Sequence, residues 1–232
     1  MNKLDGIDTL LIDLDDTIFD FGKAEGIAVR AAFTECGVEP SEDLLADYTV
    51  INRGIWKELE RGEITREVLL VERFRRLYEK RGIEKDPSVV AKLYPEKLSK
   101  GHFWLPGARD AIIGLSKKFD IYIASNGTYW IQYGRIKTSD LEDFVKGVFI
   151  SQDMGADKPS PLYFDACFER MGKDRKRCAM IGDSLTSDIL GGRNAGLVTV
   201  WVNTNGLEPD PSIIPDITVR TLGDVLALTG SR

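Results

Sequence analysis

The sequence predicts an α/β protein in which a doubly wound parallel sheet, a Rossmann-like core, carries an inserted helical-bundle cap. From about residue 106 onward, short apolar runs of strand length alternate with amphipathic segments of helical period, the pattern of a parallel sheet covered by helices. Another apolar run, at residues 10–12, lies near the start of the chain. Between that run and residue 100 the pattern is helical only, which indicates a separate unit inserted directly after the first strand.

The expected domains are therefore an α/β core formed by residues 1–20 and 101–232 and a helical cap formed by residues 21–100. A chain of 232 residues is long enough for a core domain and a smaller insert. In the cap, Ser41 and Thr65 are typical N-cap residues and several glycines end apolar stripes. The expected cap helices cover residues 23–36, 41–62, 65–82 and 86–98.

In the core, turn residues such as Gly and Pro separate apolar runs of strand length from longer amphipathic segments. The expected strands after the first are residues 120–124, 147–150, 178–181, 198–202 and 217–219. The expected helices are residues 107–118, 129–138, 161–171, 187–195 and 223–228. Strands joined in this way run parallel, so their carboxyl ends share one edge of the sheet.

The charge balance and the lengths of the apolar runs exclude several classes of partner. The formal net charge is −6, whereas binding a nucleic-acid polymer requires a basic face. No apolar run approaches the 18 or more residues of a membrane span. We therefore expect no nucleic-acid and no membrane partner, whereas a small phosphorylated metabolite remains possible because local charge decides its binding.

The counts of cysteine and histidine limit which metal sites and proton-transfer groups the protein can contain. Cys36, Cys167 and Cys178 are widely spaced with no C-x-x-C pair, and Met1–Gly6 is polar rather than a signal peptide, so we expect a cytoplasmic protein with reduced thiols. His102 is the only histidine. Zinc sites with several histidine ligands are therefore excluded, and proton transfer is expected to use carboxylates.

Acidic residues follow the first apolar run. Asp13, Asp15 and Asp16 come directly after residues 10–12 and precede Thr17. Buried carboxylates are costly unless cations or donors meet them, and ligands of open α/β sheets bind at the carboxyl ends of the strands. Asp13 and Asp15 leave an extended chain on the same side, so they could hold a cation or act as nucleophile and acid/base. The alternative is that these acids only end a strand and begin a turn.

Other strand ends supply the groups that such a pair requires. Ser125 ends the second strand, Lys158 lies in the loop after the third, and Asp183 follows the fourth, with Asp188 five residues later. Each has a structural alternative: a helix cap for Ser125, a solvated lysine for Lys158, and turn or helix-start acids for the aspartates. Because parallel strands place these ends at one edge, we favour a common functional site. Asp16 points away from the pair by alternation and is assigned no catalytic role.

The motifs D-L-D-D-T, S-N-G, K-P and G-D-S-L-T-S-D, in this order and each after a predicted strand, resemble those of the haloacid dehalogenase (HAD) superfamily. Most members of that superfamily are Mg²⁺-dependent phosphatases that form an aspartyl-phosphate. The helical insert after the first motif resembles the C1 cap of the superfamily. The resemblance extends over the whole chain.

The resemblance implies a role for each motif residue in phosphoryl transfer. Asp13 would attack phosphorus, and Asp15 would protonate the leaving alkoxide and then deprotonate the attacking water. Ser125 would donate a hydrogen bond to the phosphoryl group, and Lys158 would balance the charge of Asp13 and the phosphoryl group. Thr17 would order the substrate-binding loop.

The resemblance also implies Mg²⁺ as the cofactor. The ion would be held by the carboxylate of Asp13, the backbone carbonyl of Asp15 and the carboxylate of Asp183, which are the oxygen ligands that Mg²⁺ prefers. Asp188 would ligate it directly, ligate it through water, or support the other ligands.

The substrate is expected to be a phosphate monoester, because halide departure would not need the acid at Asp15. The stretches D-D-T-I-F-D-F and I-N-R-G-I-W-K-E-L-E-R-G-E-I-T resemble the pyrimidine 5′-nucleotidase-like branch, which acts on nucleoside 5′-monophosphates. Asn126, Asn52, Arg53 and Trp56 are the candidates to face the substrate. Trp56 could stack on a base or pack between cap helices.

Other functions are compatible with the same residues. One is a sugar-phosphate or phosphoglycolate phosphatase, and a related one is a phosphomutase. A non-enzymatic alternative is a phosphate- or Mg²⁺-responsive regulatory domain, although receiver domains of that kind are about half as long and lack the helical insert. We expect a monomer or a homodimer.

Overall fold

The computed structural model of the chain describes residues 4–229. These residues form two compact units: one contains residues 4–21 and 102–229, and the other contains residues 22–101. The sequence placed the cap at residues 21–100, within one residue of this division. Among the described residues, no helix combines the length and the apolar character that crossing a membrane requires.

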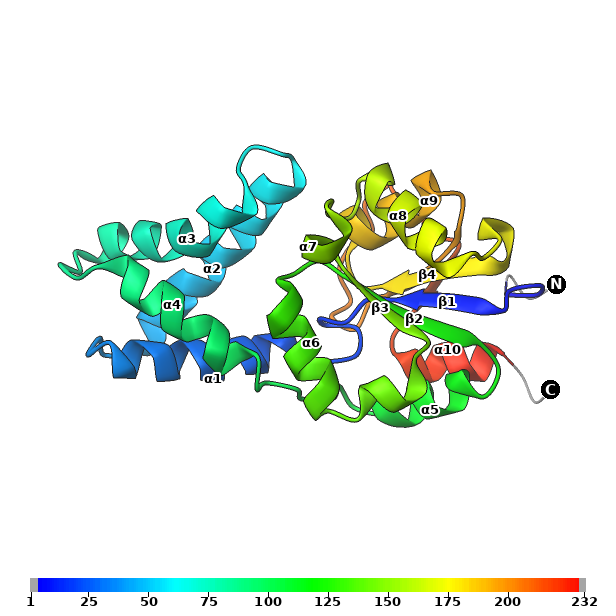
Figure 1. The fold of residues 1–232 in the computed structure, drawn as a ribbon, viewed down its shortest axis with the longest axis horizontal. Helices are drawn as coiled ribbons and strands as arrows, with labels where there is room; N and C mark the ends of the chain where they lie inside the picture. The colour runs from blue at the N-terminus through cyan, green and yellow to red at the C-terminus, as the bar shows by residue number, and fades with distance from the viewer. Residues whose placement is uncertain (1–3, 230–232) are drawn as a thin grey trace. The chain divides into compact units, whose positions relative to one another are not determined.

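Within residues 4–229, the first unit is built on a six-stranded parallel sheet (Figure 1). Its spatial order is β3-β2-β1-β4-β5-β6, and every neighbouring pair is parallel. The predicted fold class is therefore confirmed. The strands are β1 (Thr9–Ile12), β2 (Asp120–Ser125), β3 (Gly147–Ile150), β4 (Cys178–Gly182), β5 (Val198–Val202) and β6 (Ile217–Val219).

Helices cover both faces of this sheet, as Figure 1 shows. Strand alternation decides which side chains meet which layer. Leu10 and Ile12 pack into the layer under α5 (Ala108–Ser116) and α10 (Leu222–Leu228), whereas Leu11 packs on the opposite face with α8 (Pro161–Met171). All of β1 is buried, which is why its sequence reads as a continuous apolar run.

The connection after β4 differs from the prediction. In place of one helix over residues 187–195, the chain forms a wide π-helical turn η3 (Leu185–Leu190) followed by α9 (Gly191–Asn194). The turn starts earlier because the Ser184 hydroxyl caps it by accepting a hydrogen bond from the Ser187 N–H. The remaining core helices are α6 (Tyr129–Thr138), which was predicted, and the short η1 (Leu141–Phe144), α7 (Ser151–Met154) and η2 (Arg175–Arg177), which were not.

The second unit is helical throughout. Its helices are α1 (Phe21–Glu35), α2 (Glu42–Glu60), α3 (Arg66–Arg81) and α4 (Pro87–Leu98). Ser41 and Thr65 cap α2 and α3 as the sequence predicted, and Gly82 ends α3 in the left-handed conformation that favours glycine. The core of the unit is aromatic: Tyr48 stacks on Phe74 with ring centroids 5.3 Å apart.

A polar cluster is buried within the same unit. Asn52 on α2 donates from Nδ2 to Glu25 Oε1 (2.6 Å) and accepts at Oδ1 from Arg73 Nη1 (3.2 Å). The guanidinium of Arg73 lies 4.7 Å from the centroid of the Tyr94 ring, a cation–π distance. Glu25, Asn52 and Arg73 are all at most 5% exposed, so we call them the cap cluster.

The order of the strands identifies where a ligand would bind in the core. The chain first builds outward from β1 through β2 to β3, and then returns to place β4 on the other side of β1. Open α/β sheets bind ligands outside the carboxyl ends of the strands at such a switch point. In this protein the switch point lies between β1 and β4, whose next residues are Asp13 and Asp183.

Candidate active site

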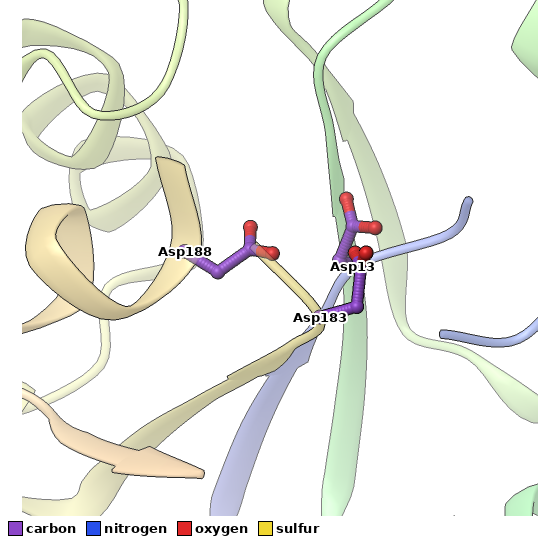
Figure 2. Close-up of side chains that lie close together, drawn as sticks. All are labelled: Asp13, Asp183 and Asp188. Carbon is purple, nitrogen blue, oxygen red and sulfur yellow. The ribbon is translucent and has the colours of Figure 1, made fainter. Parts of the chain in front are cut away.

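A group of carboxylates lies at the switch point between β1 and β4. Asp13 follows β1, Asp183 follows β4, and Asp188 extends from η3 toward both, as Figure 2 shows. One carboxylate oxygen from each of these residues lies within 4.8 Å of the other two. Asp13 and Asp188 are buried and Asp183 is half-buried. The structure therefore brings together three of the acids that the sequence assigned to the site.

Lys158 is the cation that joins this group. Its ammonium donates to Asp13 Oδ1 (2.6 Å), to Asp188 Oδ1 (2.7 Å) and to the carbonyl of Ala124 at the end of β2 (2.6 Å). All three hydrogens of the ammonium thus have acceptors, and the side chain is only 1% exposed. Asp13, Lys158, Asp183 and Asp188 are called the acid cluster below.

The acid cluster carries more negative than positive charge, and the pKa values reflect this. Burial raises the pKa of the Asp13 carboxyl to about 8, and Lys158 offsets only part of that effect. The pKa of Asp183 is raised as well, first by loss of water and then by the neighbouring Asp13 and Asp188. Burial alone would lower the pKa of Lys158, but the carboxylates of Asp13 and Asp188 outweigh it and raise that pKa.

Asn126 fixes the position of the Lys158 loop. Its side chain donates from Nδ2 to the carbonyl of Lys158 (2.9 Å) and accepts at Oδ1 from the N–H of Lys158 (2.8 Å). A paired bond of this kind replaces the missing backbone partners of a loop residue. In the structure Asn126 therefore holds the ends of two connections together, and its contact with substrate stays a prediction.

Backbone features after β4 place the two acids of that connection. A Cβ atom on Gly182 would lie 2.1 Å from Asp188 Oδ2, so the carboxylate occupies space that only glycine leaves open. Asp188 also accepts from the Ser184 N–H (3.0 Å). The buried indole of Trp201 on β5 donates to the carbonyl of Asp183 (2.8 Å). These contacts make the G-D-S motif a rigid support for Asp183 and Asp188.

Asp15 has a different set of partners. Arg135 Nη1 donates to Asp15 Oδ1 (2.5 Å), and Gln132 Nε2 donates to Asp15 Oδ2 (2.7 Å). The same Gln132 amide nitrogen donates to Ser125 Oγ (2.9 Å). Asp15 and Ser125, which the sequence assigned to the site, are therefore connected through α6. The predicted metal contact of Asp15 is through its backbone carbonyl, which these side-chain bonds leave unaffected, and it stays a prediction.

Asp16 and Thr17 shape the turn that follows. Asp16 has φ +57°, a left-handed conformation that glycine adopts most easily and Asp tolerates. Its carboxylate accepts from the N–H of Phe21, the first residue of α1 (3.1 Å), so it acts as an anchor for that helix start. Thr17 is 1% exposed, and its hydroxyl has no hydrogen-bond partner among the described residues.

The cap residues assigned to the substrate have different environments. Asn52 is buried in the cap cluster, whereas Arg53 is exposed. Trp56 is half-buried, and the guanidinium of Arg66 lies 5.6 Å from its ring centroid. One face of the Trp56 ring is therefore occupied within the cap. Roles of these three residues in substrate binding stay predictions.

The acid cluster fits a divalent cation of the Mg²⁺ type. Its donors are carboxylate oxygens, which Mg²⁺ prefers over nitrogen or sulfur. Three carboxylates lie around the ammonium of Lys158, so positive charge in the cluster falls short of negative charge. Burial and then the neighbouring carboxylates raise the pKa values of Asp13 and Asp183. A bound cation would correct this shortfall, and Asp13, Asp183 and Asp188 are the residues placed to hold it.

Gln132 and Arg135 are the site residues that sequence reasoning missed. Both lie on α6 and both are at most 3% exposed. The sequence could have identified Arg135. At 3.6 residues per turn it lies on the same face of the helix as the apolar Ile131 and Ile136. An arginine on the buried stripe of a helix that follows a motif loop indicates a carboxylate partner.

Comparisons with known proteins agree with this geometry. Residues 7–196 match the haloacid dehalogenase-like hydrolase family. The HAD-hydrolase YfnB of Bacillus subtilis is 40% identical over 94% of this chain and 93% of its own length. The solved magnesium-bound structure of YfnB has a TM-score of 0.92, with 38% identity over 97% of this chain and 99% of that one.

Two other relatives have names that state an activity. The pyrimidine 5′-nucleotidase PynA of Streptococcus pneumoniae is 37% identical over 94% of this chain and 92% of its own length. The pyrimidine 5′-nucleotidase YjjG of Escherichia coli is 31% identical over 94% of this chain and 96% of its own length. With the family match and the parallel sheet, these similarities establish that the chain belongs to the haloacid dehalogenase-like hydrolases.

Proposed function

We propose that this protein is a Mg²⁺-dependent phosphomonoester hydrolase that acts through an aspartyl-phosphate on nucleoside 5′-monophosphates. The observation that carries the proposal is the acid cluster at the β1/β4 switch point, with Asp15 held two residues beyond Asp13 by partners of its own. In this arrangement Asp13 can act as the nucleophile and Asp15 as the acid/base. The names of PynA and YjjG support the choice of substrate class.

In the first half of the reaction, a carboxylate oxygen of Asp13 forms a bond to phosphorus while the bond from phosphorus to the ester oxygen breaks. Asp15 transfers a proton to that ester oxygen, which leaves as the nucleoside hydroxyl. In the second half, water attacks the phosphorus of the aspartyl-phosphate, and Asp15 accepts a proton from that water. Inorganic phosphate is released and the Asp13 carboxylate is restored.

The other residues stabilise charge and position the substrate. The ammonium of Lys158 lies 2.6 Å from the Asp13 carboxylate and favours its ionised, attacking form, although it offsets only part of the rise in pKa that burial causes. Ser125 lies beside Asp15 at the end of β2 and supplies a hydroxyl to the phosphoryl group. Mg²⁺ held by Asp13, Asp183 and Asp188 would neutralise phosphate charge and permit the carboxylate and phosphate to approach.

A panel of phosphate monoesters, assayed with Mg²⁺ and after chelation, tests this proposal. We expect hydrolysis of nucleoside 5′-monophosphates and of p-nitrophenyl phosphate, with both activities lost on chelation and restored by Mg²⁺. Turnover of sugar phosphates or phosphoglycolate with nucleotides inert would contradict the nucleotidase assignment. Hydrolysis unaffected by chelation would contradict the metal. An isomerised sugar phosphate in place of free phosphate would indicate a phosphomutase.

A further inference from the structure

The polar residues of α6 form a connected set of hydrogen bonds around Asp15 and Ser125. Arg135 Nη1 donates both to Asp15 Oδ1 (2.5 Å) and to the side-chain carbonyl of Gln132 (2.8 Å). Gln132 Nε2 donates both to Asp15 Oδ2 (2.7 Å) and to Ser125 Oγ (2.9 Å). Both oxygens of the Asp15 carboxylate thus accept hydrogen bonds from side chains of α6.

Arg135 is held in place by more than its ion pair. Its side chain has no solvent exposure, and its guanidinium lies 5.6 Å from the ring centroid of Phe19 and 5.7 Å from that of Phe21. A buried guanidinium is costly and requires a fixed carboxylate partner. Its aromatic walls and its planar shape leave Arg135 little freedom. The position of Asp15 is therefore set by a rigid group rather than by solvent.

The direction of the hydrogen bonds matters for Ser125. Arg135 can only donate, so the Gln132 carbonyl must face it and the Gln132 amide must face Asp15 and Ser125. Ser125 Oγ then accepts from the amide, and its own hydrogen must point elsewhere. The carbonyl of Asn126 is its long contact, at 3.4 Å. Arg135 thus acts through Gln132 to keep the Ser125 hydrogen available to a phosphoryl group.

The glycine of the S-N-G motif provides independent support. A Cβ atom on Gly127 would lie 2.7 Å from Gln132 Cγ and 3.1 Å from Gln132 Nε2. Gly127 has no left-handed conformation that would require glycine for the backbone. Its lack of a side chain is therefore explained by the space that Gln132 needs to reach Asp15 and Ser125.

We propose that Gln132 and Arg135 are positioning residues for phosphoryl transfer: they orient the acid/base carboxylate of Asp15 and the hydroxyl of Ser125. This inference rests on the proposed phosphatase function. If it is correct, the effect of losing either residue depends on whether the leaving group needs a proton. A nucleoside alkoxide leaves only when Asp15 protonates the ester oxygen as the bond to phosphorus breaks, whereas p-nitrophenolate leaves readily without a proton. Loss of either positioning residue must therefore affect the two substrates unequally.

The test measures kcat/KM for uridine 5′-monophosphate and for p-nitrophenyl phosphate with Mg²⁺ present. This ratio reports on the steps up to leaving-group departure. For Gln132→Met, which keeps the length of the side chain and removes its donors, we expect a loss of about 100-fold on the nucleotide. On p-nitrophenyl phosphate we expect a loss of roughly 10-fold or less, from the misplaced Ser125 hydroxyl alone. Arg135→Gln is expected to show the same inequality, and Arg135→Lys to recover part of the nucleotide activity.

Controls separate positioning from damage to the fold. Lys137→Met changes an exposed residue of the same helix and is expected to match the unmodified protein on both substrates. Circular dichroism and thermal unfolding show whether each variant is folded. If Arg135→Gln is not folded, the kinetics of Gln132→Met and Arg135→Lys test the inference instead. Equal losses on the two substrates, or no loss, would overturn the inference. If the unmodified protein hydrolyses neither substrate, the proposed function itself fails and takes the inference with it.

Discussion

The acid cluster of the core and the cap cluster are both buried and both charged, but they are balanced differently. In the cap cluster, Arg73 and Glu25 carry opposite charges and the amide of Asn52 joins them. In the acid cluster, Lys158 faces several carboxylates, and the pKa values of Asp13 and Asp183 are raised. A buried group of charges that is balanced internally is structural, whereas one that lacks positive charge is prepared for a ligand.

The difference also explains where the two clusters lie in their units. The cap cluster is packed among helices and aromatic rings, with Tyr94 against Arg73, and the side chain of Asn52 bonds both Glu25 and Arg73. The acid cluster lies at the end of a sheet, where the backbone leaves the strands and opens toward ligands. Asp15 remains 24% exposed at this edge. Within the acid cluster itself, Asp183 is half-buried, whereas Asp13 and Asp188 are buried.

The largest expected effect comes from removing the nucleophile of the acid cluster. Asp13→Asn keeps the shape of the side chain but cannot form the aspartyl-phosphate, so hydrolysis of p-nitrophenyl phosphate should fall by about 10⁴-fold or more. The fold should persist, because the substitution removes one of the crowded negative charges. Steady-state kinetics and circular dichroism check both statements. Full activity in this variant would show that Asp13 is not the nucleophile.

Removing the cation from each cluster in turn separates their effects on stability and on catalysis. Lys158→Met leaves Asp13 and Asp188 buried without their ammonium. Arg73→Met removes the positive charge of the cap cluster and the guanidinium that donates to Asn52. We expect each to lower the free energy of unfolding by about 3–5 kcal/mol. Only Lys158→Met should also lower kcat, by about 100-fold or more. Chemical denaturation and kinetics well below the unfolding temperature separate the two effects.

The outcome for Arg73→Met decides how far the two clusters differ. A change in kcat on the order of twofold or less would agree with a structural cap cluster. A loss as large as that of Lys158→Met would place the cap cluster in the catalytic machinery. A raised KM with an unchanged kcat would instead favour the predicted contact of Asn52 with substrate.

The smallest expected effect concerns pH. Because the pKa of Asp13 is raised from 3.8 to about 8, the folded metal-free protein keeps a proton over a range in which the unfolded chain has lost it. Its free energy of unfolding should therefore fall as pH rises through that range. Between about pH 5 and about pH 8 we expect a decrease in Tm of roughly 5 °C, which about 2 kcal/mol produces in a chain of this length.

Two controls isolate this contribution from other titrating groups. Asp13→Asn lacks the titrating carboxyl, so its Tm should fall less over the same pH range. Mg²⁺ should raise the Tm of the unmodified protein most at high pH, because binding requires the ionised carboxylates. A Tm of the metal-free protein that falls no more than that of Asp13→Asn would contradict the raised pKa.

Much of the site could be predicted because it lies at the ends of strands. An apolar run that ends in Asp13, another that ends in Ser125 and a third that ends before Asp183 are local patterns, and parallel strands must bring their ends to one edge. The same local logic predicted the caps at Ser41 and Thr65. It failed for the turn after β4, where a π-helical turn begins before the predicted helix.

Local patterns were enough to predict the parallel sheet, the helical insert and the acids at the strand ends, because each depends on residues close together in the chain. The pairing of side chains, in contrast, became visible in the folded chain. Gln132 and Arg135 meet Asp15 across more than 115 residues, and Asn126 holds the backbone of Lys158. Such pairs depend on β1 lying between β2 and β4. Periodicity identifies the face of an element that is buried, but the partner buried against it is set by the order in which the strands assemble.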